Sequence, residues 1–168
     1  IEDPEASEWR LIGLNHDLLF ATYPSGGGFA PHTDGTTRHS LNRRSFLSVI
    51  IYLNDCEQGG ETRFYRPEAA EYIRLFPDNR FSCVDSFALT EVKARLGRFL
   101  VFDQALVHEG RPPAQPHQKH IIRSDLMFER QPMVFHSQED ILAYEAYDEA
   151  CALAADNKYE KATVLFDR

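Results

Sequence analysis

The sequence predicts a mainly β protein, a sandwich or barrel, followed by a C-terminal pair of helices. Up to about residue 128, short apolar or alternating segments are separated by clusters of Gly, Pro, Asn and Asp, a pattern typical of strands joined by turns. From Ser137 onward, apolar residues recur at helical spacing instead. Many short strands with turns rich in Gly and Pro favour two packed sheets or a barrel.

Five segments are predicted strands, because aromatic and β-branched residues are enriched in most of them. They are residues 18–23, 46–53, 62–65, 98–102 and 120–128. A long stretch, 66–91, separates two of these core strands. Within it, a short helix is one expectation for 72–76, and the sequence does not indicate the role of the stretch.

Residues 137–168 are predicted to form a helical hairpin. Ser137 is an expected N-cap, because acidic residues follow it in the first turn. Asp156-Asn157 interrupts the helical spacing, which resumes from Tyr159 to Phe166. The hairpin is either a two-helix cap packed on the β domain or a unit that resembles a tetratricopeptide repeat. We therefore expect one domain over 1–136, with its core at about 18–130, and a C-terminal extension over 137–168.

Composition excludes several classes of function. The 168 residues include 18 Lys plus Arg and 26 Asp plus Glu, a formal charge of −8, which argues against a nucleic-acid partner because phosphate binding needs Lys and Arg. The longest apolar segments are far shorter than the roughly 20 residues that span a bilayer, so no membrane partner is expected.

Cysteine usage favours a reducing compartment such as the cytoplasm, because Cys56, Cys83 and Cys151 are odd in number and far apart. The chain opens without Met and ends inside an expected helix. We therefore expect a fragment of a longer protein, whose localisation and oligomeric state the sequence does not give.

The motif that carries chemistry is His32-Thr-Asp34, which follows a Gly-rich turn. Two residues that are two apart project to the same side of an extended strand, so an imidazole and a carboxylate there can hold one edge of a metal ion. His108 follows the strand predicted at 98–102 and is the best third ligand. Two His and one carboxylate are the donor set of non-haem Fe(II) sites with open positions.

Two cations follow His108. Lys119 lies eleven residues later and begins a predicted strand, and Arg123 lies four residues further along the same strand face. Either cation is suited to pair with the distant carboxylate of a cosubstrate chelated to the metal.

Six ordered segments now resemble a known family. They are Tyr23–Gly35, Ser48–Asn54, Gly59–Phe64, Gly97–Phe102, His108–Pro113 and Lys119–Asp125. In this order, over most of the chain, they resemble the 2-oxoglutarate- and Fe(II)-dependent dioxygenases, specifically the prolyl 4-hydroxylase-like branch.

The resemblance implies a double-stranded β-helix, or jelly-roll, in which His32, Asp34 and His108 are the iron ligands. It places Lys119 on the residue that pairs with the C5 carboxylate of 2-oxoglutarate, with Arg123 left open as the alternative. It places Tyr23 and Tyr52 near positions that line the cosubstrate pocket.

The implied activity is hydroxylation of a prolyl or other peptide side chain, or of a small molecule, at the metal mouth. Fe(II), 2-oxoglutarate and O2 are the implied cofactor and cosubstrates, with ascorbate as a reductant and with succinate and CO2 as products.

Other interpretations remain open. They are a cupin-like metal-binding jelly-roll that does not use 2-oxoglutarate, a non-catalytic scaffold, and, disfavoured by the acidic charge, a nucleic-acid demethylase. The locally basic segment 36–45 is expected either to flank the metal mouth or to be a solvated loop. Glu109 is expected to be an exposed loop residue rather than a partner of the metal ligands.

Overall fold

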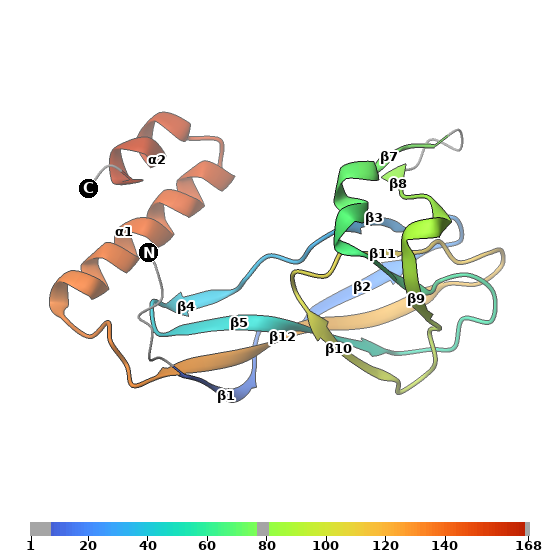
Figure 1. Cartoon of the computed structure of the whole chain (residues 1–168), viewed down its shortest axis with the longest axis horizontal. Coiled ribbons are helices and arrows are strands. Elements are labelled where there is room, and N and C mark those ends of the chain that lie inside the picture. The colour runs from blue at the N-terminus through green and yellow to red at the C-terminus, as the bar shows by residue number, and fades with distance from the viewer. Residues whose placement is uncertain (1–7, 77–80, 167–168) are drawn as a thin grey trace. The chain divides into compact units, whose positions relative to one another are not determined.

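The computed structural model describes residues 8–76 and 81–166 (Figure 1). In its N-terminal half the elements are β1 (Glu8–Leu14), β2 (Leu19–Tyr23), β3 (Phe29–His32), β4 (Arg38–Ser40), β5 (Arg43–Tyr52), β6 (Thr62–Tyr65), the 3-10 helix η1 (Pro67–Tyr72) and β7 (Arg74–Leu75). They continue with β8 (Phe81–Ser82), η2 (Asp85–Phe87), β9 (Ala88–Val92), β10 (Phe99–Asp103), β11 (His108–Gly110), β12 (Lys119–Gln131), α1 (Gln138–Ala155) and α2 (Tyr159–Phe166).

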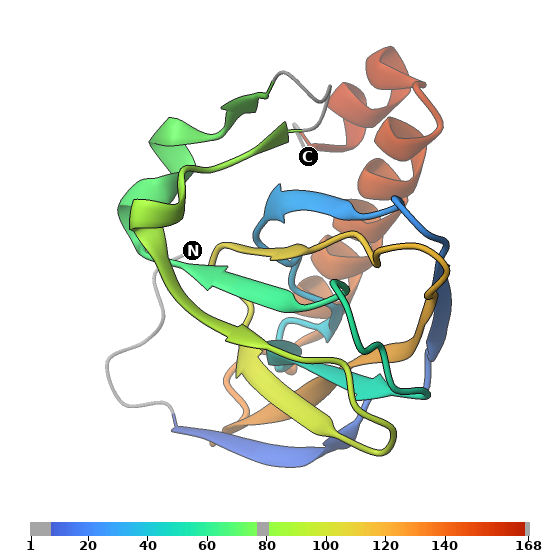
Figure 2. The same cartoon turned by 90° about the vertical axis from the view of Figure 1, so that its right-hand side faces the viewer.

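Two sheets form the predicted jelly-roll core. The six-stranded sheet has the order β1-β12-β5-β10, with β2 also paired to β12 and β4 to β5. The four-stranded sheet has the order β3-β11-β6-β9. β11 pairs antiparallel with β3 and β6, and β10 with β5. The crossovers between strands distant in sequence are visible in Figure 2.

Side chains from both sheets pack together in an apolar core cluster. Ile50 and Tyr52, two residues apart on β5, share a face as the strand period requires. They pack with Phe64 of β6, Phe102 of β10 and Ile121 of β12. The rings of Phe64 and Phe102 meet edge to face with centroids 5.0 Å apart, a favoured aromatic geometry. This core fixes the strands that carry the site described below.

The insertion 66–91 differs from its expectation, because no helix forms at 72–76. The helical turn comes earlier, over Pro67–Tyr72, where proline pre-sets the backbone of a first turn. Arg74–Leu75 instead pairs with Phe81–Ser82 as a short hairpin. A brief apolar segment is compatible with strand as well as helix, so periodicity alone does not separate the two.

The C-terminal helices form as predicted. Ser137 is the N-cap of α1, and it makes a reciprocal capping box with Asp140. The chain leaves α1 at Asp156 and adopts a left-handed conformation at Asn157, with φ 61°, a conformation that Asn tolerates. None of the described helices is long and apolar enough to cross a membrane.

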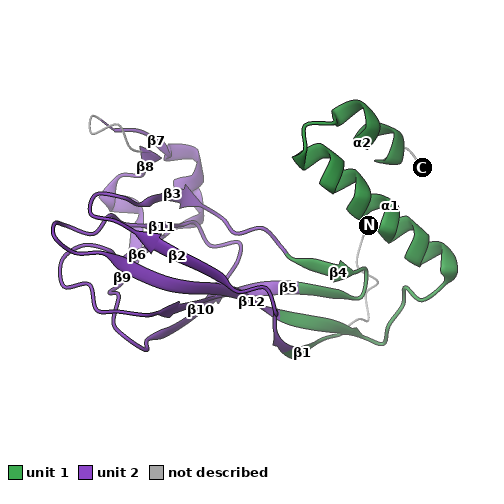
Figure 3. Ribbon diagram, turned by 180° about the vertical axis from the view of Figure 1, so that it is seen from behind, with its two compact units in different colours: residues 1–12, 37–44, 127–168 green, residues 13–36, 45–126 purple. Residues whose placement is uncertain are grey.

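The chain divides into two compact units, coloured separately in Figure 3. Unit 1 comprises 1–12, 37–44 and 127–168, and unit 2 comprises 13–36 and 45–126. In unit 1, Tyr144 of α1 donates a hydrogen bond to the Arg38 carbonyl. The basic segment is a hairpin of β4 and the start of β5 rather than a free loop, and its Arg43 pairs with Glu129.

Candidate metal centre

Strand pairing brings the three predicted ligands together in unit 2. His32 ends β3 and lies opposite His108, the first residue of β11. Asp34 lies in the loop after β3 rather than on the strand, and its backbone amide donates to the Gln104 carbonyl at 2.9 Å. The Gly-rich turn permits the pairing, because a Cβ at Gly28 would lie only 2.7 Å from the Gly110 carbonyl oxygen.

One ligand atom from each of His32, Asp34 and His108 lies within 4.8 Å of the other two. His32 Nε2 is 3.4 Å from Asp34 Oδ1, and His108 Nε2 is 3.7 Å from Asp34 Oδ2. The two imidazole rings are 4.3 Å apart between centroids. Two nitrogens and one carboxylate therefore face a common point.

Hydrogen bonds fix which imidazole nitrogen faces that point. Nδ1 of His32 lies 2.8 Å from the Ala30 carbonyl oxygen, and Nδ1 of His108 lies 2.9 Å from that of Leu106. A carbonyl only accepts, so each Nδ1 carries the proton and each Nε2 presents a lone pair, as in metal-binding histidines. This donor set fits a divalent transition metal such as Fe(II).

The surroundings of the three side chains favour the protonation states that bind a metal cation. Burial opposes ionisation of Asp34, but the His32 ring beside it, the hydrogen bond from Ser48 and the charge of Arg123 outweigh burial and hold the carboxyl pKa below its usual range. Ser48 Oγ donates to Asp34 Oδ2 at 2.5 Å, and Arg123 Nη2 lies 3.1 Å from Oδ1. Burial lowers the pKa of His108, which favours the neutral form of its ring. A carboxylate and neutral imidazoles are the forms that bind metals.

A cavity of about 300 Å³ adjoins the three ligands. Its walls include Ile50 and Ile121, which are apolar, and Thr62, which is polar. Lys119 and Arg123 supply two cations to the same cavity. A small acid with one end at the metal point and the other at a cation matches this lining.

The two cations differ in what they already contact. Arg123 lies within 3.5 Å of the carboxylates of Asp34 and Asp125. Lys119, which is 2% exposed, pairs with no carboxylate among residues 8–76 and 81–166, and its Nζ lies 4.4 Å from the Tyr23 ring centroid. A Cβ at Gly110 would lie 3.3 Å from that Nζ, so the glycine leaves room for the ammonium.

Tyr23 and Tyr52, the two tyrosines predicted near the cosubstrate, differ in position. Tyr23 lines the cavity. Tyr52 does not line it; its hydroxyl is 2.7 Å from Oγ1 of Thr62, which does. The sequence did not indicate a role for Thr62 or Ser48. Strand alternation offers the signal that could have found them, because Ser48 shares a face with Ile50 and Tyr52, and Thr62 shares one with Phe64.

The expectation for Glu109 is wrong. Glu109 lies on β11 and is 7% exposed, not in an exposed loop. Because it alternates with His108, it faces the other side of the four-stranded sheet. A strand of three residues between two turns has no sequence pattern of its own, so the burial of Glu109 had no detectable signal.

Solved structures of several proteins are similar to this chain. A prolyl 4-hydroxylase of Pseudomonas putida is 20% identical, with 65% of this chain and 49% of that chain covered and a TM-score of 0.42. A Trichoplax adhaerens prolyl hydroxylase, solved with a hypoxia-inducible-factor peptide fragment, is 20% identical, with coverage of 69% and 44% and a TM-score of 0.46. An RmlC-like cupin of Desulfovibrio desulfuricans is 13% identical, with coverage of 74% and 85% and a TM-score of 0.33.

The chain thus spans about half the length of the two hydroxylases. No curated protein matches it. The family model described as the 2OG-Fe(II) oxygenase superfamily matches residues 18–124. Since that match covers well over half of the chain, the protein belongs to the 2OG-Fe(II) oxygenase superfamily.

Proposed function

We propose that this protein is an Fe(II)- and 2-oxoglutarate-dependent dioxygenase that hydroxylates a peptide side chain, most simply a prolyl residue, and releases succinate and CO2. The observation that carries the proposal is a buried Lys119, without a carboxylate partner among the described residues, in the cavity beside three convergent metal donors. Resemblance of the six sequence segments to prolyl hydroxylases supports the prolyl substrate.

In this proposal His32, Asp34 and His108 hold Fe(II) through the two Nε2 atoms and one carboxylate. When bound, Fe(II) with 2-oxoglutarate supplies oxygen activation coupled to oxidative decarboxylation. Ser48 and Arg123 orient the Asp34 carboxylate through their hydrogen bond and ion pair. Contacts of this kind typically tune metal affinity by about 10- to 100-fold.

Lys119 binds the C5 carboxylate of 2-oxoglutarate in this proposal. Arg123 already balances Asp34 and Asp125, whereas the Lys119 ammonium has no carboxylate among the described residues. A charge-assisted pair in a site shielded from water is strong and selects a diacid over a monoacid. The side chains of Ile50 and Ile121 exclude water from the carbon chain between the two ends.

The buried Lys119 also separates this function from the cupin-like alternative. A metal-binding cupin that does not use 2-oxoglutarate has no need of an ammonium in the barrel, where burial of an unpaired charge is costly. A scaffold without catalysis likewise has no need of three convergent donors in correct tautomers.

An anaerobic titration tests the proposal. Fe(II) protein is titrated with 2-oxoglutarate and with 2-oxopentanoate, which lacks the distal carboxylate, while the metal-to-ligand charge-transfer absorption is followed. We expect 2-oxoglutarate to bind at least about tenfold more tightly, and Lys119→Met to remove that preference. Lys161→Met, a change at an exposed lysine of α2, is the matched control and keeps the preference.

Arg123→Gln distinguishes the two cations. We expect this variant to bind Fe(II) more weakly but still to prefer the diacid. Loss of the diacid preference in Arg123→Gln, with the preference retained in Lys119→Met, would reverse the assignment. Absence of any absorption change in the wild-type protein would refute the dioxygenase itself. Turnover is then scored on proline-containing peptides by succinate formation and a mass gain of one oxygen atom.

A further inference from the structure

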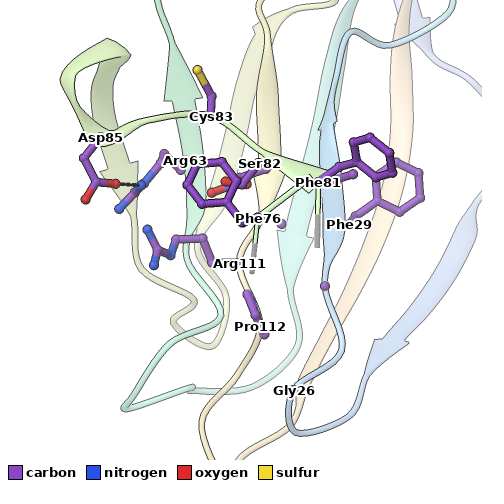
Figure 4. Close-up of a pocket in the computed structure, with 14 residues that line it drawn as sticks. Gly26, Phe29, Arg63, Phe76, Phe81, Ser82, Cys83, Asp85, Arg111 and Pro112 are labelled. Carbon is purple, nitrogen blue, oxygen red and sulfur yellow. Dashed lines mark hydrogen bonds and ion pairs between the residues drawn. The ribbon is translucent and has the colours of Figure 1, made fainter. Parts of the chain in front are cut away.

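A second cavity, of about 370 Å³, lies on the other face of the four-stranded sheet (Figure 4). Arg63 and Glu109 of this sheet line it, and they alternate along their strands with Thr62 and His108, which line the metal cavity. The insertion supplies Phe76 and Phe81 to its opposite wall. The metal chemistry does not use this cavity.

Glu109 is the charged side chain of this cavity that lacks a cationic partner among the described residues. Its side chain is 7% exposed, and Ser82 Oγ donates to its Oε2 at 3.0 Å. No Lys, Arg or His among the described residues forms an ion pair with it. Buried carboxylates are normally paired with a cation or bound to a metal, so Glu109 is unusual in lining a cavity without one.

The two arginines of the cavity are already matched by other acids. Arg63 pairs with Asp85 and Glu91, and its side chain is only 12% exposed. Arg111 Nη1 lies 3.4 Å from Glu91 Oε1. Glu91 pairs with both arginines but does not line the cavity; with it counted, two guanidinium groups are matched against three carboxylates, so this cluster carries one negative charge in excess.

The remaining lining suits a long cationic side chain. Phe29, Phe76 and Phe81 contribute aromatic rings to the walls. Ring faces attract ammonium and guanidinium groups, and their apolar surface suits the methylene stem of Lys or Arg. The net charge of −8 on the chain also favours the approach of a basic peptide.

Phe29 and Gly110 line both cavities, so they form the border between this cavity and the metal cavity. Phe29 begins β3, which is an edge strand of the four-stranded sheet. A peptide that crosses this edge reaches both cavities. We propose that the second cavity is a specificity subsite for a Lys or Arg side chain of the peptide substrate, with Glu109 as the partner of its charge. This inference rests on the proposed function, because the peptide's target residue enters the metal cavity.

Binding of defined peptide pools tests the subsite directly. The probes are fluorescein-labelled, proline-centred peptide pools in which one flanking position is fixed in turn as Arg, Lys, Gln or Glu. Anisotropy is measured on the whole chain, with Mn(II) and 2-oxoglutarate and without them. We expect Arg or Lys at one position to tighten binding about tenfold over Gln, the range of a hydrogen bond to a charged group, and Glu109→Gln to abolish that difference.

The controls separate this subsite from general charge attraction. Glu57→Gln removes a carboxylate that pairs with Arg95 outside the cavity, and it should retain the preference for basic pools. Phe76→Leu keeps an apolar wall but removes a ring, so it should weaken the preference severalfold. This second variant keeps the test valid if Glu109→Gln fails to fold.

Three results would overturn the inference. The first is equal binding of Gln and basic pools, and the second is a basic preference that persists in Glu109→Gln. The third is a preference for Glu pools that Arg111→Gln removes, because the cavity would then bind an anion. Each result leaves the dioxygenase proposal intact, since the charge-transfer titration and succinate formation test that proposal.

Discussion

The Lys119 ammonium is buried, and burial lowers its pKa to about 8. Only the protonated form pairs with a carboxylate, so binding of 2-oxoglutarate must take up a proton above that pH. We predict that the apparent Kd is flat below pH 8 and then rises about tenfold per pH unit. Calorimetric titrations from pH 6.5 to about 9.5 measure it. In Lys119→Arg, whose guanidinium stays charged, the rise should disappear.

The same burial is expected to reduce the stability of the ligand-free protein. The Lys119 pKa falls from 10.5 to about 8, so between these values the unfolded chain binds more protons than the folded one, and stability rises with pH. We predict that Lys119→Met stabilises the ligand-free protein by about 2–3 kcal/mol at pH 7. Urea denaturation measures the change. Lys161→Met should alter stability by less than about 0.5 kcal/mol, and equal effects would contradict the argument.

Ser48 is expected to act on the metal through Asp34. Its hydroxyl donates to Asp34 Oδ2, which restrains the carboxylate and favours its ionised form. We predict that Ser48→Ala weakens Mn(II) binding by about tenfold, as measured by electron paramagnetic resonance titration. Ser124→Ala removes an equally buried hydroxyl, whose partner is the Asn15 carbonyl. Comparable losses in the two variants would indicate a general packing effect instead.

At the scale of elements, the turn between β5 and β6 is closed by two glycines with positive φ. A Cβ at Gly59 would lie 2.3 Å from the Pro112 oxygen, whereas one at Gly97, also at positive φ, meets nothing within 4 Å. We predict that Gly97→Ala costs about 1 kcal/mol for its backbone conformation. Gly59→Ala should cost at least about 2–3 kcal/mol, because backbone must also move. Urea midpoints compare the two, and equal costs would show that the turn relaxes freely.

The strands that sequence predicts well are those that build the core. β2, β5, β6, β10 and β12 lie within a few residues of the segments expected, because alternation of apolar side chains reflects their packing. β11 was not predicted, and of β3 only its last residue, His32, was expected to be in an extended segment. β3 is four residues long and contains Pro31, and β11 is His108–Gly110. β3 becomes a strand by pairing with β11, which also pairs with β6, and such non-local pairing leaves little trace in local composition.

The three candidate metal ligands could be predicted from the sequence for a different reason. The spacing of His32 and Asp34 in an expected extended segment and the position of His108 after a strand indicate a metal site without knowledge of how β3 and β11 pair. Glu109 shows the limit of this approach. Whether a side chain next to a ligand is buried depends on what covers the far face of the sheet. Here residues of the insertion 66–91 cover it, and the hairpin within that insertion was not predicted from the sequence.

At the scale of the whole molecule, the metal donors and the cations Lys119 and Arg123 all belong to unit 2. Ligands that bind only the folded state stabilise it by mass action. The donors come from the end of β3, from the loop after it and from β11, so one ion links segments about 75 residues apart in the sequence. Metal binding should therefore stabilise unit 2.

We predict that saturating Mn(II) together with 2-oxoglutarate raises the calorimetric midpoint of the transition that includes unit 2. At a concentration 100-fold above Kd, mass action supplies about 2.7 kcal/mol, or roughly 5–10 °C for a chain of this size. The His108→Ala variant should lose this rise in the midpoint, because only two of the three metal donors remain. Lys119→Met should keep the part caused by Mn(II) alone and lose the increment from 2-oxoglutarate. A shift that survives in His108→Ala would mean that the metal binds elsewhere, and it would remove the basis for assigning these three residues as ligands.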